Sequence, residues 1–303
     1  MIKVLMLDLE GTLAEGQSLF ANVPAALKAL MSFETAGGRP LGLSLVCDAD
    51  EPAAPARGRD DEDIFNRFIS RLEQLGLREF FEPTQRRVTL SVHARARLPD
   101  PDLFRTAIQR LKMKAGLGEC LFISEKTEYV LACREQLKMQ ALRFERAGGG
   151  DFDDWLDAPL LAARIIAPES PVNLRLALNL RLETTHALEL VTITSRSSDG
   201  RVICGHGRRW LPLPDLKQKG RRKIHVQMPV EVELELDAEG LLQSVKSSQP
   251  DTEELMETAA FVESLEANQQ IARGPESPSM NATHRLVEEQ GKWRLKRIRF
   301  NAA

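Results

Sequence analysis

The first half of the chain alternates short apolar runs with stretches of helical periodicity. The apolar runs, each typical of a buried strand, span residues 2–7, 41–46, 88–92, 120–124 and 141–144. Between them, apolar side chains recur about every 3.6 residues, which predicts helices over 23–31, 63–75, 101–111 and 129–137. Because strands that alternate with helices favour parallel pairing, we expect a Rossmann-like, doubly wound α/β sheet in residues 1–147.

The second half changes to alternation of apolar and polar positions. This pattern is clearest over 172–182 and 230–236, and it predicts antiparallel strands with one buried face. We expect further strands at 188–195, 201–206, 241–246, 284–289 and 293–300, and a long helix near 252–272. The glycine run 148–150 and the prolines after it predict a linker over 148–171 that contains one short helix. The second domain, 172–303, is therefore expected to be mainly antiparallel β, of the α+β class.

Length and charge narrow the classes of protein that fit this pattern. The 303 residues suffice for two domains. A formal net charge of −3 provides no overall field that would attract DNA, RNA or an anionic membrane, so a nucleic acid is not an expected partner. No apolar run reaches the length of a membrane span, and Asp8 and Glu10 interrupt the apolar stretch near the N-terminus. We therefore expect a cytoplasmic protein with reduced cysteines and no membrane partner.

One basic stretch breaks the even distribution of charge in the second half. It includes Arg208, Arg209 and most residues of 217–223. With a single aromatic residue and many acids nearby, a solvated hairpin loop is the simpler interpretation. An acidic partner or RNA is the alternative.

Chemically useful side chains follow three of the predicted parallel strands at their carboxyl ends. Asp8 follows the run 2–7, Cys47 follows 41–46, and Glu125 follows 120–124. In doubly wound sheets, chemistry takes place at this edge. Asp8 and Glu10, two residues later, are candidates there for nucleophilic attack and proton transfer. The alternative is an ordinary turn with two solvated acids.

The segment Asp-Leu-Glu-Gly-Thr-Leu at 8–13 resembles the first motif of the haloacid dehalogenase (HAD) superfamily, usually Asp-x-Asp-Gly-Thr. The enolase-phosphatase branch of that superfamily also has glutamate at the second acid. Residues 75–92, Pro-Asp-Pro-Asp-Leu-Phe at 99–104 and Cys-Leu-Phe-Ile-Ser-Glu at 120–125 are similar, in order, to the later motifs. The resemblance covers residues 1–146. Only about 14–40 separate the first two motifs, so it implies little or no cap domain, and the loop 48–61 is the nearest equivalent of a lid.

The resemblance implies a Mg²⁺-dependent phosphohydrolase that cleaves a phosphate monoester through an aspartyl-phosphate at Asp8. Glu10 would act first as general acid and then as general base. The implied ligands of the substrate phosphate are Thr12, Cys47 and Arg97. The implied ligands of Mg²⁺ are Asp8, Glu10 through its carbonyl, and Glu125.

Three of the matched motifs depart from the family pattern. Cys47 stands where serine or threonine is usual, Leu98 replaces a lysine, and Ser124-Glu125 replaces Gly-Asp. These departures leave a second prediction open, namely a catalytically inactive pseudoenzyme that serves as a binding or assembly scaffold. The partner is then an unknown protein rather than a small phosphate ester, and a homo-oligomer is compatible with both predictions. Residues 172–303 resemble no family with an assignable function.

Overall fold

The computed structural model describes residues 1–49, 61–214, 223–273, 282–289 and 291–298. The chain divides into two compact units, Met1–Arg181 and Leu182–Ala303. Most of the expected lid loop and most of the basic stretch 217–223 lie outside the described residues.

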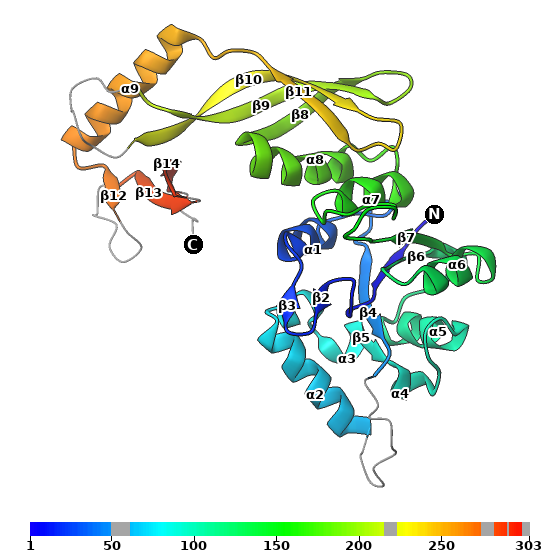
Figure 1. Ribbon diagram of the computed structural model, residues 1–303. Helices are drawn as coiled ribbons and strands as arrows, with labels where there is room; N and C mark the ends of the chain where they lie inside the picture. Colours follow the sequence, from blue (N-terminus) through cyan, green and yellow to red (C-terminus); the bar gives the residue numbers. More distant parts are fainter. Residues whose placement is uncertain (50–60, 215–222, 274–281, 290, 299–303) are drawn as a thin grey trace. The chain divides into compact units, whose positions relative to one another are not determined.

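The first unit is built on a five-stranded parallel sheet, in the order β5-β4-β1-β6-β7 (Figure 1). The strands are β1 (Val4–Leu7), β4 (Gly42–Cys47), β5 (Val88–Leu90), β6 (Cys120–Ser124) and β7 (Gln140–Arg143). The predicted parallel α/β sheet is thereby confirmed. The third predicted strand is shorter than expected, because α4 (Ser91–Ala94) begins directly after Leu90.

Helices and a small hairpin complete the first unit. The elements are β2 (Ala14–Glu15), β3 (Ser18–Leu19), α1 (Val23–Met31), α2 (Asp61–Gln74), α3 (Thr84–Arg87), α5 (Pro101–Arg110), α6 (Thr127–Glu135), α7 (Ala158–Ile166) and short 3₁₀ turns at Arg78–Phe81 and Leu117–Glu119. Helix α5 shows how the sequence starts a helix. The Asp100 carboxylate accepts a hydrogen bond from the Asp102 N–H at 2.8 Å, and Pro101 occupies the first turn.

The core of the first unit surrounds the central strand. All four residues of β1 are fully buried, which explains why its sequence is a continuous apolar run rather than an alternation. On one face, Met6 and Phe122 pack with Phe104 of α5 and Cys133 of α6. Phe104 and Phe122 meet edge to face with their centroids 5.1 Å apart.

The segment predicted as a linker is instead packed into the first unit. Trp155 is almost fully buried, and its Nε1 donates a hydrogen bond to the Thr12 carbonyl at 2.9 Å. Its ring packs against Phe144 and Phe152. Helix α7 follows, with most of its residues buried. Glycines and prolines suggested a linker, but the apolar residues between them supply core.

The predicted strand over 172–182 is wrong, because this segment belongs to helix α8 (Pro171–His186). Leu174, Ala177, Leu178 and Leu182 are buried, and their spacing is helical. Leucine, alanine and arginine favour helix, and the segment has a single β-branched residue, so its alternation was a weak strand signal.

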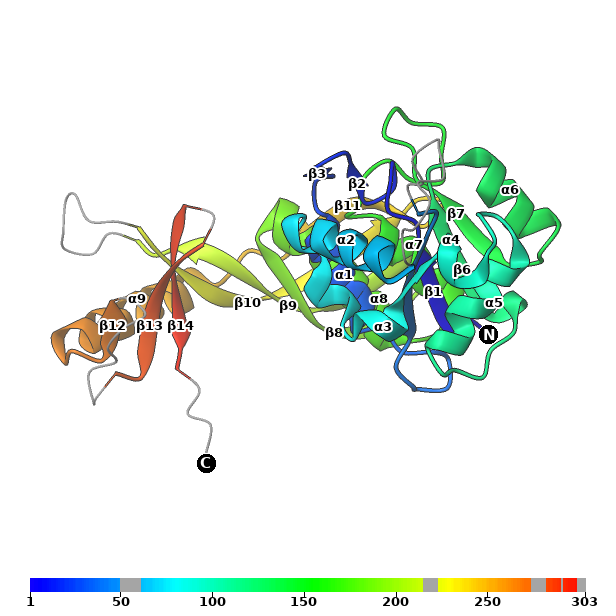
Figure 2. The same ribbon diagram turned by 90° about the horizontal axis from the view of Figure 1, so that it is seen from below.

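The second unit contains a seven-stranded mixed, mostly antiparallel sheet, in the order β12-β13-β14-β10-β9-β8 with β11 also on β10 (Figures 1 and 2). Its strands are β8 (Leu188–Arg196), β9 (Val202–Pro212), β10 (Ile224–Leu236), β11 (Leu242–Ser247), β12 (Ile271–Arg273), β13 (His284–Glu289) and β14 (Lys292–Arg297). The pairs β10–β14 and β12–β13 are parallel. The expected antiparallel β character and the long helix, α9 (Thr252–Ala267), are confirmed.

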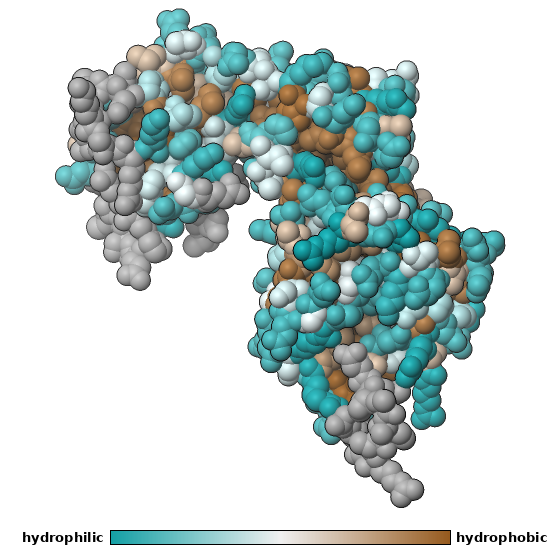
Figure 3. Space-filling view, viewed as in Figure 1, coloured by the Kyte–Doolittle hydropathy of each residue, from teal (hydrophilic) through white to brown (hydrophobic). Residues whose placement is uncertain are grey.

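Alternation along β10 produces one buried face, as predicted. Val226 and Met228 point toward Val262 of α9 and form a small apolar core with it. On the face drawn in Figure 3, hydrophilic side chains cover most of the first unit. Among the described residues, no helix has the length and apolar character needed to cross a membrane.

Candidate functional site

Three strand ends meet beside Asp8. Strands β4 and β6 flank β1, with Leu45 and Ile123 both in register with Leu7. Asp8 directly follows β1, and its N–H donates to the Ile123 carbonyl at 3.1 Å. The carboxyl edge of the sheet therefore brings together Asp8, Cys47 at the end of β4 and Ser124 at the end of β6.

The Asp8 carboxylate is buried and surrounded by hydrogen-bond donors. Its Oδ1 accepts from the Leu9 N–H at 2.8 Å, and its Oδ2 accepts from Ser124 Oγ at 3.1 Å. Burial raises the pKa of Asp8 to about 6, and the Leu9 N–H, the charge of Lys126 and the Ser124 hydroxyl limit the rise. Asp8 is thus an ionised, weakly solvated carboxylate at neutral pH, as a nucleophile requires.

Cys47 contacts the same carboxylate as a thiol. Burial, together with the charge of Asp8, raises the pKa of Cys47 well above its ordinary value, and the thiol shares a hydrogen bond with Asp8. The side chain therefore stays protonated and serves as a weak donor. Cys47 therefore lies next to Asp8, and its role toward phosphate stays a prediction.

Lys126 supplies a cation that the sequence analysis missed. It follows β6 and precedes α6, and its charge lowers the pKa of Asp8. Its ammonium Nζ lies 3.2 Å from Tyr129 Oη and 4.7 Å from the centre of the same ring. By contrast, Leu98, at the position where a lysine was expected, is buried in the apolar core. The available signal was a lysine two residues after a strand end at the carboxyl edge.

Asp48 is a second residue that the sequence analysis left without a role. Its Oδ1 accepts from the Leu98 N–H at 2.9 Å, and its Oδ2 accepts from Tyr129 Oη at 3.2 Å. Its charge raises the pKa of Asp8 and also that of Lys126. Asp8, Lys126 and Asp48 therefore form an electrostatically coupled group of one cation and two carboxylates.

The Glu10 carboxylate is held away from a general-acid role. Its Oε1 accepts from the Gly16 N–H at 2.9 Å, and Arg71 of α2 forms an ion pair with it. Although partial burial raises it, the hydrogen bonds of Gly16 and Arg71 hold the pKa of Glu10 below its ordinary value. Glu10 is therefore an anion at neutral pH, which favours proton acceptance over proton donation.

Thr12 and Glu125 join the turns that follow β1 and β6. Thr12 Oγ1 accepts from the Glu125 N–H at 2.9 Å. The Glu125 carboxylate lies against Gly11, where an added Cβ would stand 1.8 Å from Oε1. Gly11 also has a φ of +71°, so this turn requires glycine for two reasons. The Glu125 side chain thus lies over the turn that begins at Asp8.

The structure does not gather the remaining predicted ligands, those of phosphate and of Mg²⁺, into one group. Arg97 is exposed in the turn before Leu98, and its role toward phosphate stays a prediction. Across the ranges that the structure describes, no three His, Cys, Asp or Glu side chains gather into a group that could hold a metal ion. Asp8 and Glu125 contribute carboxylate oxygens to adjoining turns, which is suitable donor chemistry for Mg²⁺ but only part of a coordination sphere.

The arrangement combines a buried carboxylate, two hydrogen-bond donors and an ammonium group at the carboxyl edge of a parallel sheet. Such a group can bind an anion next to Asp8 and stabilise charge that develops there. No protein-family model matches the chain, and no curated protein is significantly similar to it.

Proposed function

We propose that the first unit is a HAD-like phosphohydrolase that cleaves phosphate monoesters through Asp8. The observation that carries this proposal is the Asp8 carboxylate, buried at the end of the central strand and faced by Ser124, Cys47 and the charge of Lys126. The order of the sequence motifs supports the same assignment.

In the first step, an Asp8 oxygen attacks phosphorus and the ester P–O bond breaks, giving an aspartyl-phosphate and an alcohol. The leaving oxygen takes a proton from the general acid, for which Glu10 is the proposed residue. Because Arg71 keeps Glu10 ionised, Glu10 must first leave this ion pair and gain a proton. In the second step, Glu10 accepts a proton from water as the water oxygen attacks phosphorus. The bond between phosphorus and the Asp8 oxygen then breaks, which releases phosphate and restores the carboxylate.

Lys126 performs the electrostatic work that the expected lysine before Pro99 would do. Its ammonium offsets the combined charge of Asp8 and the substrate phosphate. Thr12, Cys47 and Arg97 are the other proposed phosphate ligands. A bound Mg²⁺ would be held by the Asp8 carboxylate, the Glu10 carbonyl and the Glu125 carboxylate, and would withdraw charge from the phosphoryl oxygens.

The proposed substrate class rests on the short segment between β1 and β4, where related phosphatases insert a cap. Between β1 and β4 the chain has room only for the β2–β3 hairpin and α1, which supports the proposal of little or no cap. A site without an inserted cap between these two strands suits a bulky phosphate ester.

A second candidate function is a catalytically inactive scaffold that binds a protein partner. Two observations favour it: the Glu10 carboxylate is paired with Arg71, and no three-ligand metal group is present among the described side chains. In this account, the charges of Asp8 and Lys126 influence each other's pKa without any turnover at Asp8.

A phosphatase screen with Mg²⁺ separates the two candidates. Wild type and Asp8→Asn are compared on a panel of phosphate monoesters, with and without a chelator. The phosphohydrolase proposal expects turnover that metal stimulates and that Asp8→Asn abolishes, which would also refute the scaffold. Equal background turnover in both proteins would contradict the catalytic proposal.

A further inference from the structure

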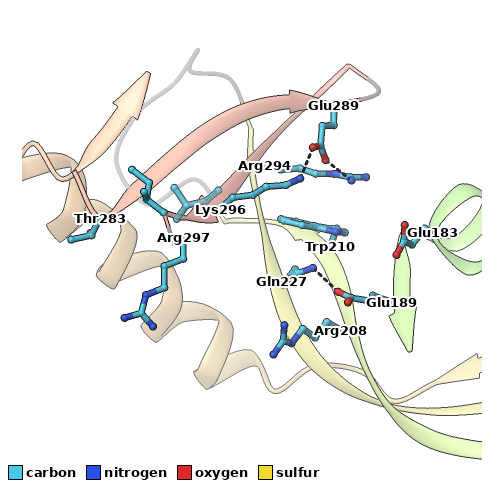
Figure 4. A pocket seen from close by; sticks show the side chains of 12 residues that line it. Glu183, Glu189, Arg208, Trp210, Gln227, Thr283, Glu289, Arg294, Lys296 and Arg297 are labelled. Atoms are coloured by element: carbon cyan, nitrogen blue, oxygen red, sulfur yellow. Dashed lines mark hydrogen bonds and ion pairs between the residues drawn. The ribbon is translucent and has the colours of Figure 1, made fainter. Parts of the chain in front are cut away.

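A groove in the second unit has chemistry that the proposed phosphohydrolase reaction does not use. Its volume is about 1190 Å³. Val226 and Met228 point toward α9, so Gln227 between them points to the opposite face of the sheet, where it lines the groove. Strands β8, β9 and β10 provide the floor of the groove, and β14 provides a wall (Figure 4).

Two guanidinium groups in this groove are candidates for binding an anion. Glu289 pairs with both Arg294 and Lys296. Arg208 and Arg297 have no side-chain hydrogen bond or ion pair with any residue that the structure describes. A guanidinium presents planar N–H donors that match a phosphate group, so each of these two side chains can bind an anion in the groove.

An aromatic platform, Trp210, lines the same groove as Arg208 and Arg297. The Arg294 guanidinium lies 4.9 Å from the centre of the Trp210 ring, and its Nη1 donates to Glu289 Oε2 at 3.0 Å. The Arg294 side chain is only 12% exposed. Trp210 itself is half-buried and lines the groove, so a planar group can pack against it without first ordering the wall.

Acceptors lie on the other side of Trp210 from Arg297 (Figure 4). They are the carboxylates of Glu183 and Glu189, and Gln227 Nε2 donates to Glu189 at 3.1 Å. Burial, together with the charges of Glu189 and Glu289, raises the pKa of Glu183. These two acids favour a ligand that brings hydroxyl or amino donors to this end of the groove.

We propose that the groove binds a mononucleotide. Its phosphate lies between Arg208 and Arg297, its base packs on Trp210, and its sugar or base donors reach Glu183 and Glu189. The acids in the groove oppose a continuous phosphate chain, so a single nucleotide fits better than a nucleic-acid strand. This proposal does not depend on the activity of Asp8.

Calorimetry on the full chain tests the site, with Asp8→Asn as background so that no nucleotide is hydrolysed. The probes are adenosine monophosphate, adenosine, inorganic phosphate and a single-stranded oligoadenylate. Adenosine monophosphate is expected to bind more tightly than the other three probes. The double variant Arg208→Gln/Arg297→Gln is expected to weaken its binding at least about tenfold while leaving adenosine binding unchanged. Trp210→Leu should weaken both.

Arg201→Gln, an exposed arginine in the β8–β9 turn, is the matched control and should bind like the background protein. If the double variant fails to fold by circular dichroism, Arg208→Gln alone provides the comparison. The absence of saturable binding, an unchanged affinity in the folded arginine variant, or tighter binding of the oligonucleotide would each overturn the proposal. A chain that binds adenosine monophosphate but hydrolyses no ester would contradict the proposed function and leave this site in place.

Discussion

Asp8 and Lys126 shape each other's ionisation at the centre of the candidate site. Burial raises the pKa of Asp8 to about 6, while the charge of Lys126 opposes that rise. Burial in turn lowers the pKa of Lys126, but its hydrogen bond with Tyr129 and the charges of Asp8 and Asp48 raise it overall. At neutral pH both side chains are charged, which is the state that the proposed attack on a phosphate ester requires.

Replacing Lys126 with methionine should lower kcat/KM by about a hundredfold to a thousandfold, because charge on the phosphoryl group loses its cation. The pKa of Asp8 should also rise. Since Asp8 acts when ionised, the acid limb of the pH–rate profile should move to higher pH in Lys126→Met and stay near the wild-type position in Lys126→Arg. Lys28→Met, on the exposed side of α1, is the control. An unmoved limb would contradict the role given to Lys126.

Asp8→Asn should stabilise the fold at alkaline pH. A carboxyl whose folded pKa lies above its ordinary value of 3.8 costs stability once pH exceeds the folded pKa. The cost, about 3 kcal/mol at most, disappears as pH falls from about 6 toward 4. Urea unfolding at several pH values should show a gain for Asp8→Asn at pH 8 that shrinks on acidification. A gain that is constant with pH would argue against a raised pKa.

Gly11→Ala should destabilise the turn after β1 more than Gly16→Ala does. Both glycines have positive φ, so both variants acquire backbone strain of about 1 kcal/mol. Only at Gly11 would the new Cβ overlap the Glu125 carboxylate, whereas at Gly16 nothing lies within 4 Å. Denaturant unfolding of the two variants isolates the overlap. Equal losses would show that Glu125 moves aside freely.

At the scale of elements, apolar runs predicted the parallel strands well because both faces of that sheet are buried. The same reasoning failed at α8, where leucines at every second position also satisfy a helical stripe. It also failed at 148–171, where glycine and proline flank residues that pack tightly around Trp155. Periodicity along the chain indicates which side chains are buried, but it does not show what they pack against. Both errors arose because the packing partners of these segments lie far away in the sequence.

The site was predictable only where strand ends carry its residues. Asp8, Cys47 and Ser124 follow or end predicted strands, so the sheet topology brings them together. Lys126 and Asp48 meet through Tyr129, a contact across 81 residues of sequence that spacing does not show. Glu10 was assigned from the motif, and its pairing with Arg71 depends on where α2 packs.

The first turn of helix α8 is joined to the first unit by hydrogen bonds of Asn173. Asn173 is fully buried, and its amide donates to the Glu34 carbonyl at 2.7 Å and accepts from the Glu34 N–H at 2.9 Å. Asn173→Ala should cost about 2 kcal/mol in unfolding free energy, because two buried main-chain groups lose their partners. Val172→Ala, at an exposed neighbour, should change little. Similar small effects for both would contradict the described start of α8.

At the scale of the whole molecule, each unit has its own sheet, core and candidate site. The proposed nucleophile and its cation lie in the parallel sheet of the first unit. The proposed nucleotide groove lies entirely within the second unit. This division predicts that groove variants retain the turnover of the first unit on small esters, and that Asp8 variants retain nucleotide binding.

Direct trapping of the covalent intermediate tests the central claim about Asp8. The full chain is mixed with a phosphate ester that it turns over, quenched in acid, and reduced with borohydride, which converts an aspartyl-phosphate to homoserine. Mass spectrometry of the peptide that contains residues 4–15 should find homoserine at position 8 in wild type and none in Asp8→Asn. Turnover without modification of Asp8, or modification at another residue, would contradict the account.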